Sequence, residues 1–225
     1  MSPPCLFIGN KNYSSWSMRP WLALKWAGIA FEERMIPLGG PGYGKSRIAE
    51  ILAVSDSGRV PALHAGELRI HDSLAIMEWA NEQAPEAGLY PRDAGLRALA
   101  RSAAAEMHAG FAAMRNAMSM NIRRRMKTAP AWSDEVKADL ARLFELWGGL
   151  RARHANGGPF LFGARGIVDA MYAPMATRLR TYAVEAPAAC QAYCEAIFAD
   201  DAFRAWEAGA LAEPQRIAST DELYT

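Results

Sequence analysis

The sequence predicts a small α/β domain followed by an all-helical domain. Strand and helix signals alternate through residues 1–82, and a turn-rich stretch with Pro85 and Pro91 follows at 83–93. Apolar residues then recur at helical spacing from 94 to 225. A chain of 225 residues also exceeds the usual size of one domain. We therefore expect the domain boundary at the stretch 83–93.

Each element of the first domain has a local signal. A short apolar run ending at Gly9 is typical of a buried strand and its turn, and Gly28 is well placed to end a helix. Gly66 favours a hairpin turn, and Asp72 suits the start of a helix. The expected order is strand 5–8, helix 17–26, strand 31–38, helix 46–53, strands 60–63 and 68–70, and a helix from 72 to about 82.

The second domain is predicted from helical spacing and capping residues. Apolar residues from Leu96 to Met118 recur every three or four positions, which indicates one long helix. Ser133, followed by two acidic residues, favours the start of a second helix. Three further helices are expected: one after Gly166, one over 190–197, and one that contains residues 203 and 206.

Composition narrows the function. The chain is 51% hydrophobic with a net charge of +1, so it can bury a core but lacks the positive charge typical of nucleic-acid binding. No apolar run is long enough to span a membrane, and the start lacks the features of a signal peptide. Three cysteines and four scattered histidines suggest neither a disulfide framework nor a metal site. We expect a cytoplasmic protein that binds neither nucleic acid nor membrane.

A phosphate-binding motif occurs in the sequence but does not fit its context. Gly39 to Ser46 matches G-x-x-x-x-G-K-[ST], with Lys45 as the phosphate-binding lysine. Pro41 removes one of the backbone N–H groups that such a loop presents to phosphate. The helical remainder of the chain also lacks the strands of a parallel nucleotide-binding sheet. We therefore predict a glycine-rich surface loop.

The segment from Tyr13 to Pro20 carries the chemistry. Ser14 and Ser15 fall between the first strand and the first helix, where a hydroxyl and a helix N-terminus can together stabilise a thiolate. Lowering a thiol pKa by one unit needs about 1.4 kcal/mol, and one hydrogen bond to a charged group contributes about 1.5–3 kcal/mol. One serine is therefore sufficient. The alternative is that the serine only caps the helix.

Two further pairs point to a peptide-like ligand. Pro61 opens a predicted strand, where a cis bond can hold a tight turn and leave the backbone of Val60 available for pairing. Asp72 and Ser73 open a helix, where they act as a simple cap or bind an amino-acid headgroup. In the second reading, the carboxylate holds an ammonium group and the hydroxyl holds a carboxylate.

These motifs, in this order, resemble a cytosolic glutathione transferase over essentially the whole chain. The sequence pattern around Ser14 and Ser15 is most similar to the zeta and related bacterial serine-type classes. The resemblance implies a thioredoxin-like domain followed by an α-helical domain, with glutathione as co-substrate, no metal, and a homodimer. It implies detoxification chemistry in which the glutathione thiolate attacks a small, largely apolar electrophile.

The resemblance also implies roles for individual residues. Ser14, with Ser15 as the alternative, would hydrogen-bond the glutathione sulfur. The cysteinyl part would pair with Val60 before a cis Pro61, and the γ-glutamyl end would bind Asp72 and Ser73. Lys45 or Arg59 would meet the glycine carboxylate. An acceptor site would use residues that core packing explains equally well, namely Tyr13, Met107, Phe111 and Met114.

The sequence departs from the zeta pattern at Trp16, where zeta members typically have a cysteine. This weakens a reading as maleylacetoacetate isomerase, which stays an alternative together with a non-catalytic glutathione-binding or ligand-binding protein.

Gly166 replaces the usual Ser or Thr of a capping box, and we interpret Asp169 as a folding element. The basic run 123–125, with Lys127, is interpreted as a solvated face or as an attractor for an anionic acceptor.

Overall fold

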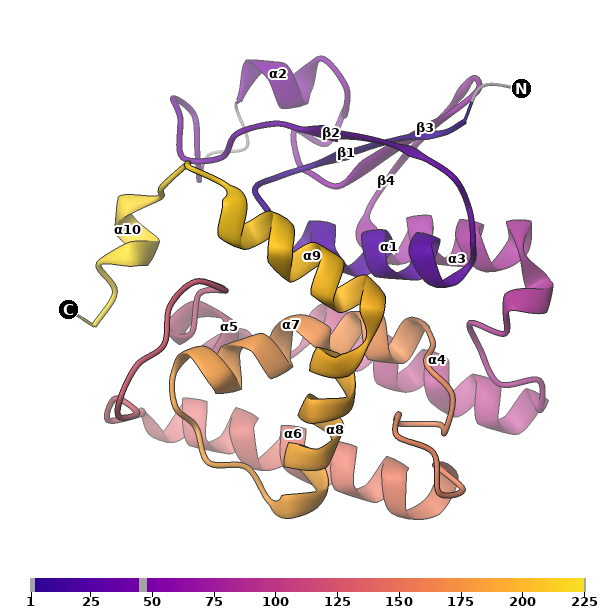
Figure 1. Ribbon diagram of the computed structural model, residues 1–225, viewed down its shortest axis with the longest axis vertical. Coiled ribbons are helices and arrows are strands. Elements are labelled where there is room, and N and C mark those ends of the chain that lie inside the picture. Colours follow the sequence, from indigo (N-terminus) through magenta and orange to yellow (C-terminus); the bar gives the residue numbers. More distant parts are fainter. Residues whose placement is uncertain (1–2, 45–47, 225) are drawn as a thin grey trace.

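The computed structural model describes residues 3–44 and 48–224. It confirms the predicted fold class, a small α/β part followed by helices (Figure 1). The elements are β1 Cys5–Ile8, α1 Ser15–Trp26, β2 Glu32–Met35, α2 Ala49–Leu52, β3 Ala62–Ala65, β4 Leu68–His71, α3 Ser73–Gln83, the 3₁₀ turn η1 Pro85–Ala87, α4 Ala94–Ala109, α5 Ala112–Ala117, α6 Asp134–His154, α7 Ile167–Thr181, α8 Ala188–Ala199, α9 Asp201–Ala212 and α10 Ala218–Asp221.

The sheet has the order β2-β1-β3-β4. β1 pairs parallel with β2 and antiparallel with β3, and β3 pairs antiparallel with β4. Helices α1 and α3 cover one face of the sheet, and α2 lies on the other face (Figure 1). A small apolar cluster with Phe7, Ile36 and Ile51 lies between the sheet and α2. This βαβ-αββα arrangement is the thioredoxin-like architecture that the resemblance implied.

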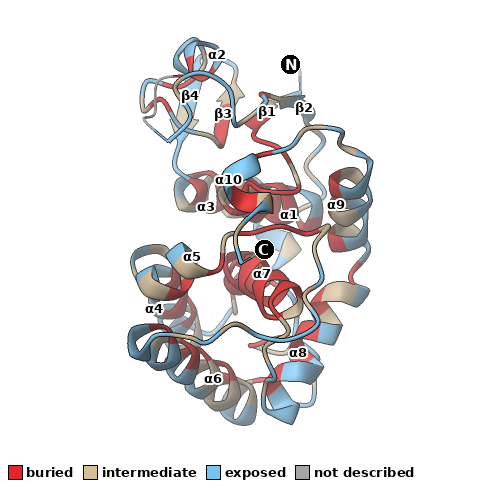
Figure 2. Ribbon diagram, turned by 90° about the vertical axis from the view of Figure 1, so that its left-hand side faces the viewer, coloured by how far each residue is buried: buried red, intermediate tan, exposed pale blue. Residues whose placement is uncertain are grey.

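Helix α1 lies at the centre of the molecule. It contacts α3 within the α/β part and α7 and α9 within the helical part. Most of its residues are buried, as is α7 along almost its whole length (Figure 2). A helix that is buried on all sides belongs to a core rather than to a surface. One continuous apolar cluster therefore joins residues of the two halves of the chain.

The long helix expected from Leu96 to Met118 is wrong: the chain forms two helices, α4 and α5. The break falls at Gly110 and Phe111, where Phe111 has a positive φ of 56°. A Cβ atom at Gly110 would lie 2.7 Å from the carbonyl oxygen of Glu106, so only glycine fits there. The apolar spacing continues across the break because α4 and α5 each bury apolar residues, among them Met107 and Met114.

Asp169 is a folding element, as the sequence indicated. Its Oδ2 accepts a hydrogen bond from the backbone N–H of Gly166 at 2.8 Å. Its Oδ1 accepts from the N–H of Leu161 at 3.2 Å and from the hydroxyl of Tyr193 at 2.9 Å. The carboxylate thereby fixes the start of α7, the preceding loop and α8 at one buried point.

Candidate active site

The two predicted serines lie at the start of α1 and have different partners. Ser14 is the N-cap, and its Oγ accepts a hydrogen bond from the N–H of Ser17 at 3.3 Å. The Ser14 hydroxyl also donates to Oγ of Ser17 at 2.7 Å. Oγ of Ser17 in turn accepts from the N–H of Gly9 at the end of β1, at 3.1 Å. Ser17, which the sequence did not single out, therefore supports Ser14 from the strand.

Ser15 lies one residue further along and is tied to the helical part of the chain. Its Oγ accepts a hydrogen bond from Nη2 of Arg178 on α7 at 3.3 Å. The same guanidinium donates to the carbonyl oxygens of Met118 at 2.7 Å and Pro174 at 3.1 Å. Ser15 is therefore a link between the two parts of the chain, while Ser14 lies on the side of the sheet.

Two adjoining cavities meet beside the serines. One, of about 370 Å³, is lined by Tyr13, Ser14, Ser15 and the loop 42–44. The other, of about 410 Å³, is lined by residues that open β3 and α3 and by α4. Trp16, Arg59 and Val60 line both cavities. The Val60–Pro61 peptide bond is cis, as the resemblance implied. The serines and the Val60–Pro61 pair therefore border two cavities that adjoin at these shared residues, together called the hollow below.

Asp72 and Ser73 lie at the far end of this hollow. Asp72 caps α3, and its Oδ1 accepts from the N–H of Leu74 at 2.8 Å. Its Oδ2 lies 3.3 Å from Nε2 of His108, which α4 contributes from the helical part. Ser73 is 1% exposed and lines the cavity, yet its hydroxyl has no hydrogen-bond partner among the described residues. A buried hydroxyl without a partner is costly, so this end of the hollow fits a polar ligand.

Three guanidinium groups contact residues that line the hollow: Arg19 and Arg115 at Trp16, and Arg178 at Ser15. Arg19 and Arg115 lie against the ring of Trp16, with Cζ 4.3 and 4.8 Å from the ring centroid. Burial, and then repulsion by Arg178 and Arg115, lower the pKa of Arg19 to about 9. Burial, and then Arg115, lower the pKa of Arg178 to about 10. Both stay protonated at neutral pH, so the cluster is an electropositive region that favours an anion.

The predicted acceptor residues are not gathered at the hollow. Met107 and Met114 are fully buried and Phe111 is 5% exposed, and all three pack in the apolar core. Core packing, the alternative that the spacing left open, accounts for them. Tyr13 does line the hollow. Lys45 lies outside the described residues, whereas Arg59 lines both cavities.

The basic run at 123–125 is only partly a solvated face: Arg125 is exposed, as is Lys127, whereas Arg123 and Arg124 are half-buried. Arg123 donates through Nη1 to the carbonyl oxygen of Glu213 at 2.5 Å and through Nη2 to that of Gln215 at 2.8 Å. Arg124 donates to the carbonyl oxygens of Asp221 and Tyr224 at 3.2 Å. These arginines bind the C-terminal segment, which lies far from them in sequence and was therefore not a foreseeable partner.

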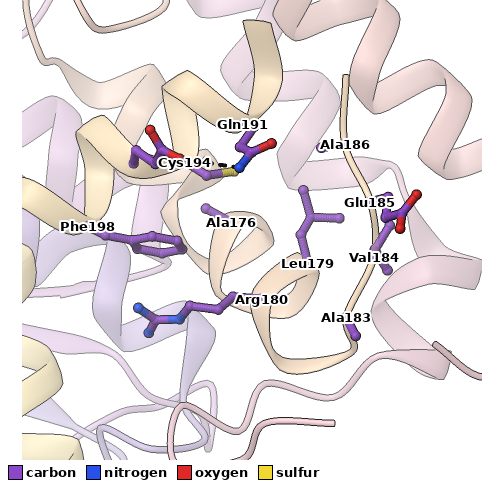
Figure 3. A pocket seen from close by; sticks show the side chains of 11 residues that line it. Ala176, Leu179, Arg180, Ala183, Val184, Glu185, Ala186, Gln191, Cys194 and Phe198 are labelled. Carbon is purple, nitrogen blue, oxygen red and sulfur yellow. Dashed lines mark hydrogen bonds between the residues drawn. The ribbon is translucent and has the colours of Figure 1, made fainter. Parts of the chain in front are cut away.

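A third cavity, of about 600 Å³, lies between α7 and α8 and shares no lining residue with the other two (Figure 3). Leu179 and Phe198 line it, and the guanidinium of Arg180 lies 4.0 Å from the centroid of the Phe198 ring. Cys194 also lines it, but burial raises the pKa of this thiol to about 12. The thiol is therefore not a nucleophile at neutral pH, and this cavity is separate from the candidate active site.

Residues 3–44 and 48–224 contain neither a metal-binding cluster nor a membrane-spanning helix. No three His, Cys, Asp or Glu side chains in these ranges come together to hold a metal ion. None of the helices in them has the length and apolar character that crossing a bilayer requires.

Comparisons with known sequences point in one direction. The family described as glutathione S-transferase, N-terminal domain, matches residues 13–83. Glutathione S-transferase 1 of Dianthus caryophyllus is 29% identical over 165 residues, which are 72% of this chain and 71% of that protein. Maleylacetoacetate isomerase of Mus musculus is 34% identical over 113 residues, which are 50% of this chain and 51% of that protein.

Solved structures share the fold. A glutathione transferase homologue from Burkholderia gl BGR1, with bound glutathione, has a TM-score of 0.72 and 23% identity, covering 94% of this chain and 100% of its own. A maleyl pyruvate isomerase of the zeta class has a TM-score of 0.70 and 23% identity, covering 94% of this chain and 99% of its own. Theta-class and omega-class enzymes have TM-scores of 0.66 and 0.65. The chain therefore has the fold of glutathione S-transferases and matches a glutathione S-transferase N-terminal domain at residues 13–83, while the proteins it is similar to belong to several classes.

Proposed function

We propose that this protein is a glutathione transferase that activates the glutathione thiol at Ser14. The observation that carries the proposal is the pair of adjoining cavities bordered by Ser14, the cis Val60–Pro61 pair and Asp72–Ser73. The serines line one cavity and the Asp72–Ser73 pair the other, so the γ-glutamyl residue of the tripeptide can reach Asp72–Ser73 while the thiol of its central cysteine lies at the start of α1.

Ser14 is the proposed donor to the glutathione sulfur. Its hydroxyl now donates to Ser17, whose own hydroxyl can donate back once that of Ser14 turns to the thiolate. The N-terminus of α1 adds its positive partial charge, and the cluster of Arg19, Arg115 and Arg178 adds full positive charge nearby. All three effects favour the anion and lower the thiol pKa.

The γ-glutamyl end of glutathione fits Asp72 and Ser73. The Asp72 carboxylate suits the γ-glutamyl ammonium group, and the buried Ser73 hydroxyl, which otherwise has no partner among the described residues, suits the γ-glutamyl carboxylate. Arg59, which lines both cavities, would suit the glycine carboxylate. The homodimer, the domain boundaries and the identity of the acceptor stay predictions.

A second candidate, glutathione-dependent isomerisation, is favoured by the guanidinium cluster. Arg115 and Arg178 lie beside Trp16 and Ser15, so an acceptor with a carboxylate group would have a cationic partner close to the attacking sulfur. An apolar electrophile has no charged group that could pair with these guanidinium groups. The two activities share the thiolate step and differ in whether the sulfur leaves again.

The function is tested by binding and turnover together. Calorimetric titration with glutathione should show saturable binding, and a chloronitrobenzene should be conjugated in a glutathione-dependent reaction. Isomerisation of a maleyl dicarboxylate without net loss of glutathione would instead support the second candidate. A chain that binds glutathione but turns over neither substrate would be the ligand-binding protein, and a chain that binds none would overturn the proposal.

Ser73→Ala is expected to raise KM for glutathione about tenfold with little change in kcat. The variant removes one hydrogen bond to a charged group, worth about 1.5–3 kcal/mol, at a point remote from the sulfur. Steady-state kinetics with varied glutathione measure it, and Ser102→Ala on the exposed side of α4 is the matched control. An unchanged KM would remove Ser73 from the binding site.

A further inference from the structure

The hydroxyl of Tyr13, directly before Ser14, is fully occupied by hydrogen bonds. It donates to Asp221, with Oδ1 at 2.9 Å and Oδ2 at 3.0 Å. It accepts from Nη2 of Arg123 at 2.8 Å and from the backbone N–H of Ile217 at 3.2 Å. A phenol has one donor and two acceptor sites, so none is left for a substrate. Asp221 and Ile217 belong to the C-terminal segment, residues 213–224.

The C-terminal segment also holds the backbone of the serine loop, residues 10–15. The Glu213 carboxylate accepts from the N–H of Lys11 at 2.7 Å and of Asn12 at 3.2 Å. The Asn12 amide donates to Asn121 at 2.9 Å, and Asn121 donates to Oδ1 of Asp221 at 2.8 Å. The serine loop is therefore bonded through its main chain and through two of its side chains.

The segment is itself anchored, so it can act as a support. Arg123 and Arg124 bind its carbonyl oxygens, as described above. Ile217 is 3% exposed, and a Cβ atom at Gly39 would lie 3.1 Å from its Cγ1. Figure 1 shows α10 at the left, below the loop that follows β2 and above the segment 118–133. The C-terminal segment thus touches both the serine loop and the glycine-rich loop, residues 39–44, whose end lines the hollow.

We propose that the C-terminal segment positions the serine for catalysis, with Asp221 as the positioning residue that acts through Tyr13. The inference rests on the proposed function at Ser14. Tyr13 fixes the main chain just before α1, and its N–H and that of Ser14 both donate to the carbonyl oxygen of Asn10. Loss of the Asp221 contact would let this turn move, and the Ser14 hydroxyl would no longer be aimed at the thiolate. Small displacements of a catalytic group are costly to the rate.

The test uses the full chain and a double-mutant cycle. Tyr13→Phe and Asp221→Ala are each expected to lower kcat about tenfold. Each should also raise the apparent pKa at which the rate increases with pH, with a smaller change in KM for glutathione. Because the two side chains share the contact between them, the loss in the double variant should be clearly less than the sum of the two single losses. Asp221→Asn keeps an acceptor oxygen and should be intermediate. Asp201→Ala, at a carboxylate whose side chain is 98% exposed, is the matched control.

Amide exchange at residues 10–15 completes the design, because it needs neither substrate nor glutathione. Asp221→Ala should accelerate exchange there and leave α6 unchanged. Folded variants with an unaltered pH profile and kcat, or with additive losses, would overturn the inference while the proposed function stands. A wild-type chain that binds no glutathione would overturn the proposed function and the catalytic role together, and unaltered exchange would overturn the support of the loop as well.

Discussion

Ser14→Ala is expected to lower kcat/KM for conjugation about 10- to 100-fold and to raise the pKa of the bound glutathione thiol by about one to two units. Both figures follow from the loss of one hydrogen bond to a charged group, about 1.5–3 kcal/mol. The fall should be largest at neutral pH and shrink as rising pH ionises the thiol without help. The pH–rate profile, together with ultraviolet titration of the bound thiolate, measures it.

Ser14 also caps α1, so a stability effect must be separated from the catalytic one. Alanine at an N-cap costs about 1 kcal/mol. Ser14→Asp keeps a capping oxygen for the N–H of Ser17 but places a negative charge beside the thiolate. It should therefore retain more stability than Ser14→Ala while being no more active. Ser15→Ala breaks the bond to Arg178 and should disturb the thiol pKa less. If Ser15→Ala alone moved that pKa, the roles of the two serines would be reversed.

Asp169→Ala is expected to lower the free energy of unfolding by about 3–5 kcal/mol, since it leaves three buried donors without a partner. These are the N–H groups of Leu161 and Gly166 and the hydroxyl of Tyr193. Tyr193 also lies 4.8 Å, centroid to centroid, from the ring of Trp147 on α6, so the loss spreads to a third helix. Urea unfolding followed by tryptophan fluorescence measures it. A loss below about 1 kcal/mol would show that Asp169 is not a structural centre.

The same carboxyl predicts a dependence of stability on pH. Burial raises the pKa of Asp169 from 3.8 to about 6, against the hydrogen bonds that it accepts. Between these values the folded chain keeps a proton that the unfolded chain has lost, so this group's contribution falls as pH rises from about 4 to 6. The contribution is on the order of 3 kcal/mol. Asp169→Asn, which does not titrate, should lack this slope in unfolding experiments at pH 4, 5 and 6, and an unchanged slope would contradict it.

Local chemistry made much of the fold predictable. The apolar run 5–8, the capping Asp72 and the turn at Gly66 each depend on neighbours in the sequence, and the structure has β1, α3 and the β3–β4 hairpin there. The break at Gly110 was missed because a glycine inside an amphipathic pattern is tolerated as often as it ends a helix. Only the close approach of the Glu106 carbonyl oxygen decides it, and this depends on the folded backbone.

The site was predictable where sequence neighbours build it and not where distant segments do. The serine loop, Val60–Pro61 and Asp72–Ser73 are each short motifs, and the structure brings them to one hollow. Arg178 lies 163 positions after Ser15, and Asp221 lies 208 positions after Tyr13. Neither carries a local signal, because a lone arginine or aspartate in a helix is ordinary surface composition. Pairing of this kind becomes visible only once the helices are packed.

The position of α1 restricts how this protein can be divided or recombined. Its buried surface belongs partly to the sheet and partly to α7 and α9. Either half expressed alone would expose an apolar area that the other half normally covers, so we expect neither half to be a soluble unit. A chimaera that exchanges the α/β part for that of a relative would also have to exchange the matching faces of α7 and α9. The two halves must therefore be exchanged together as one folding unit, although only the first half carries the motifs for the proposed co-substrate.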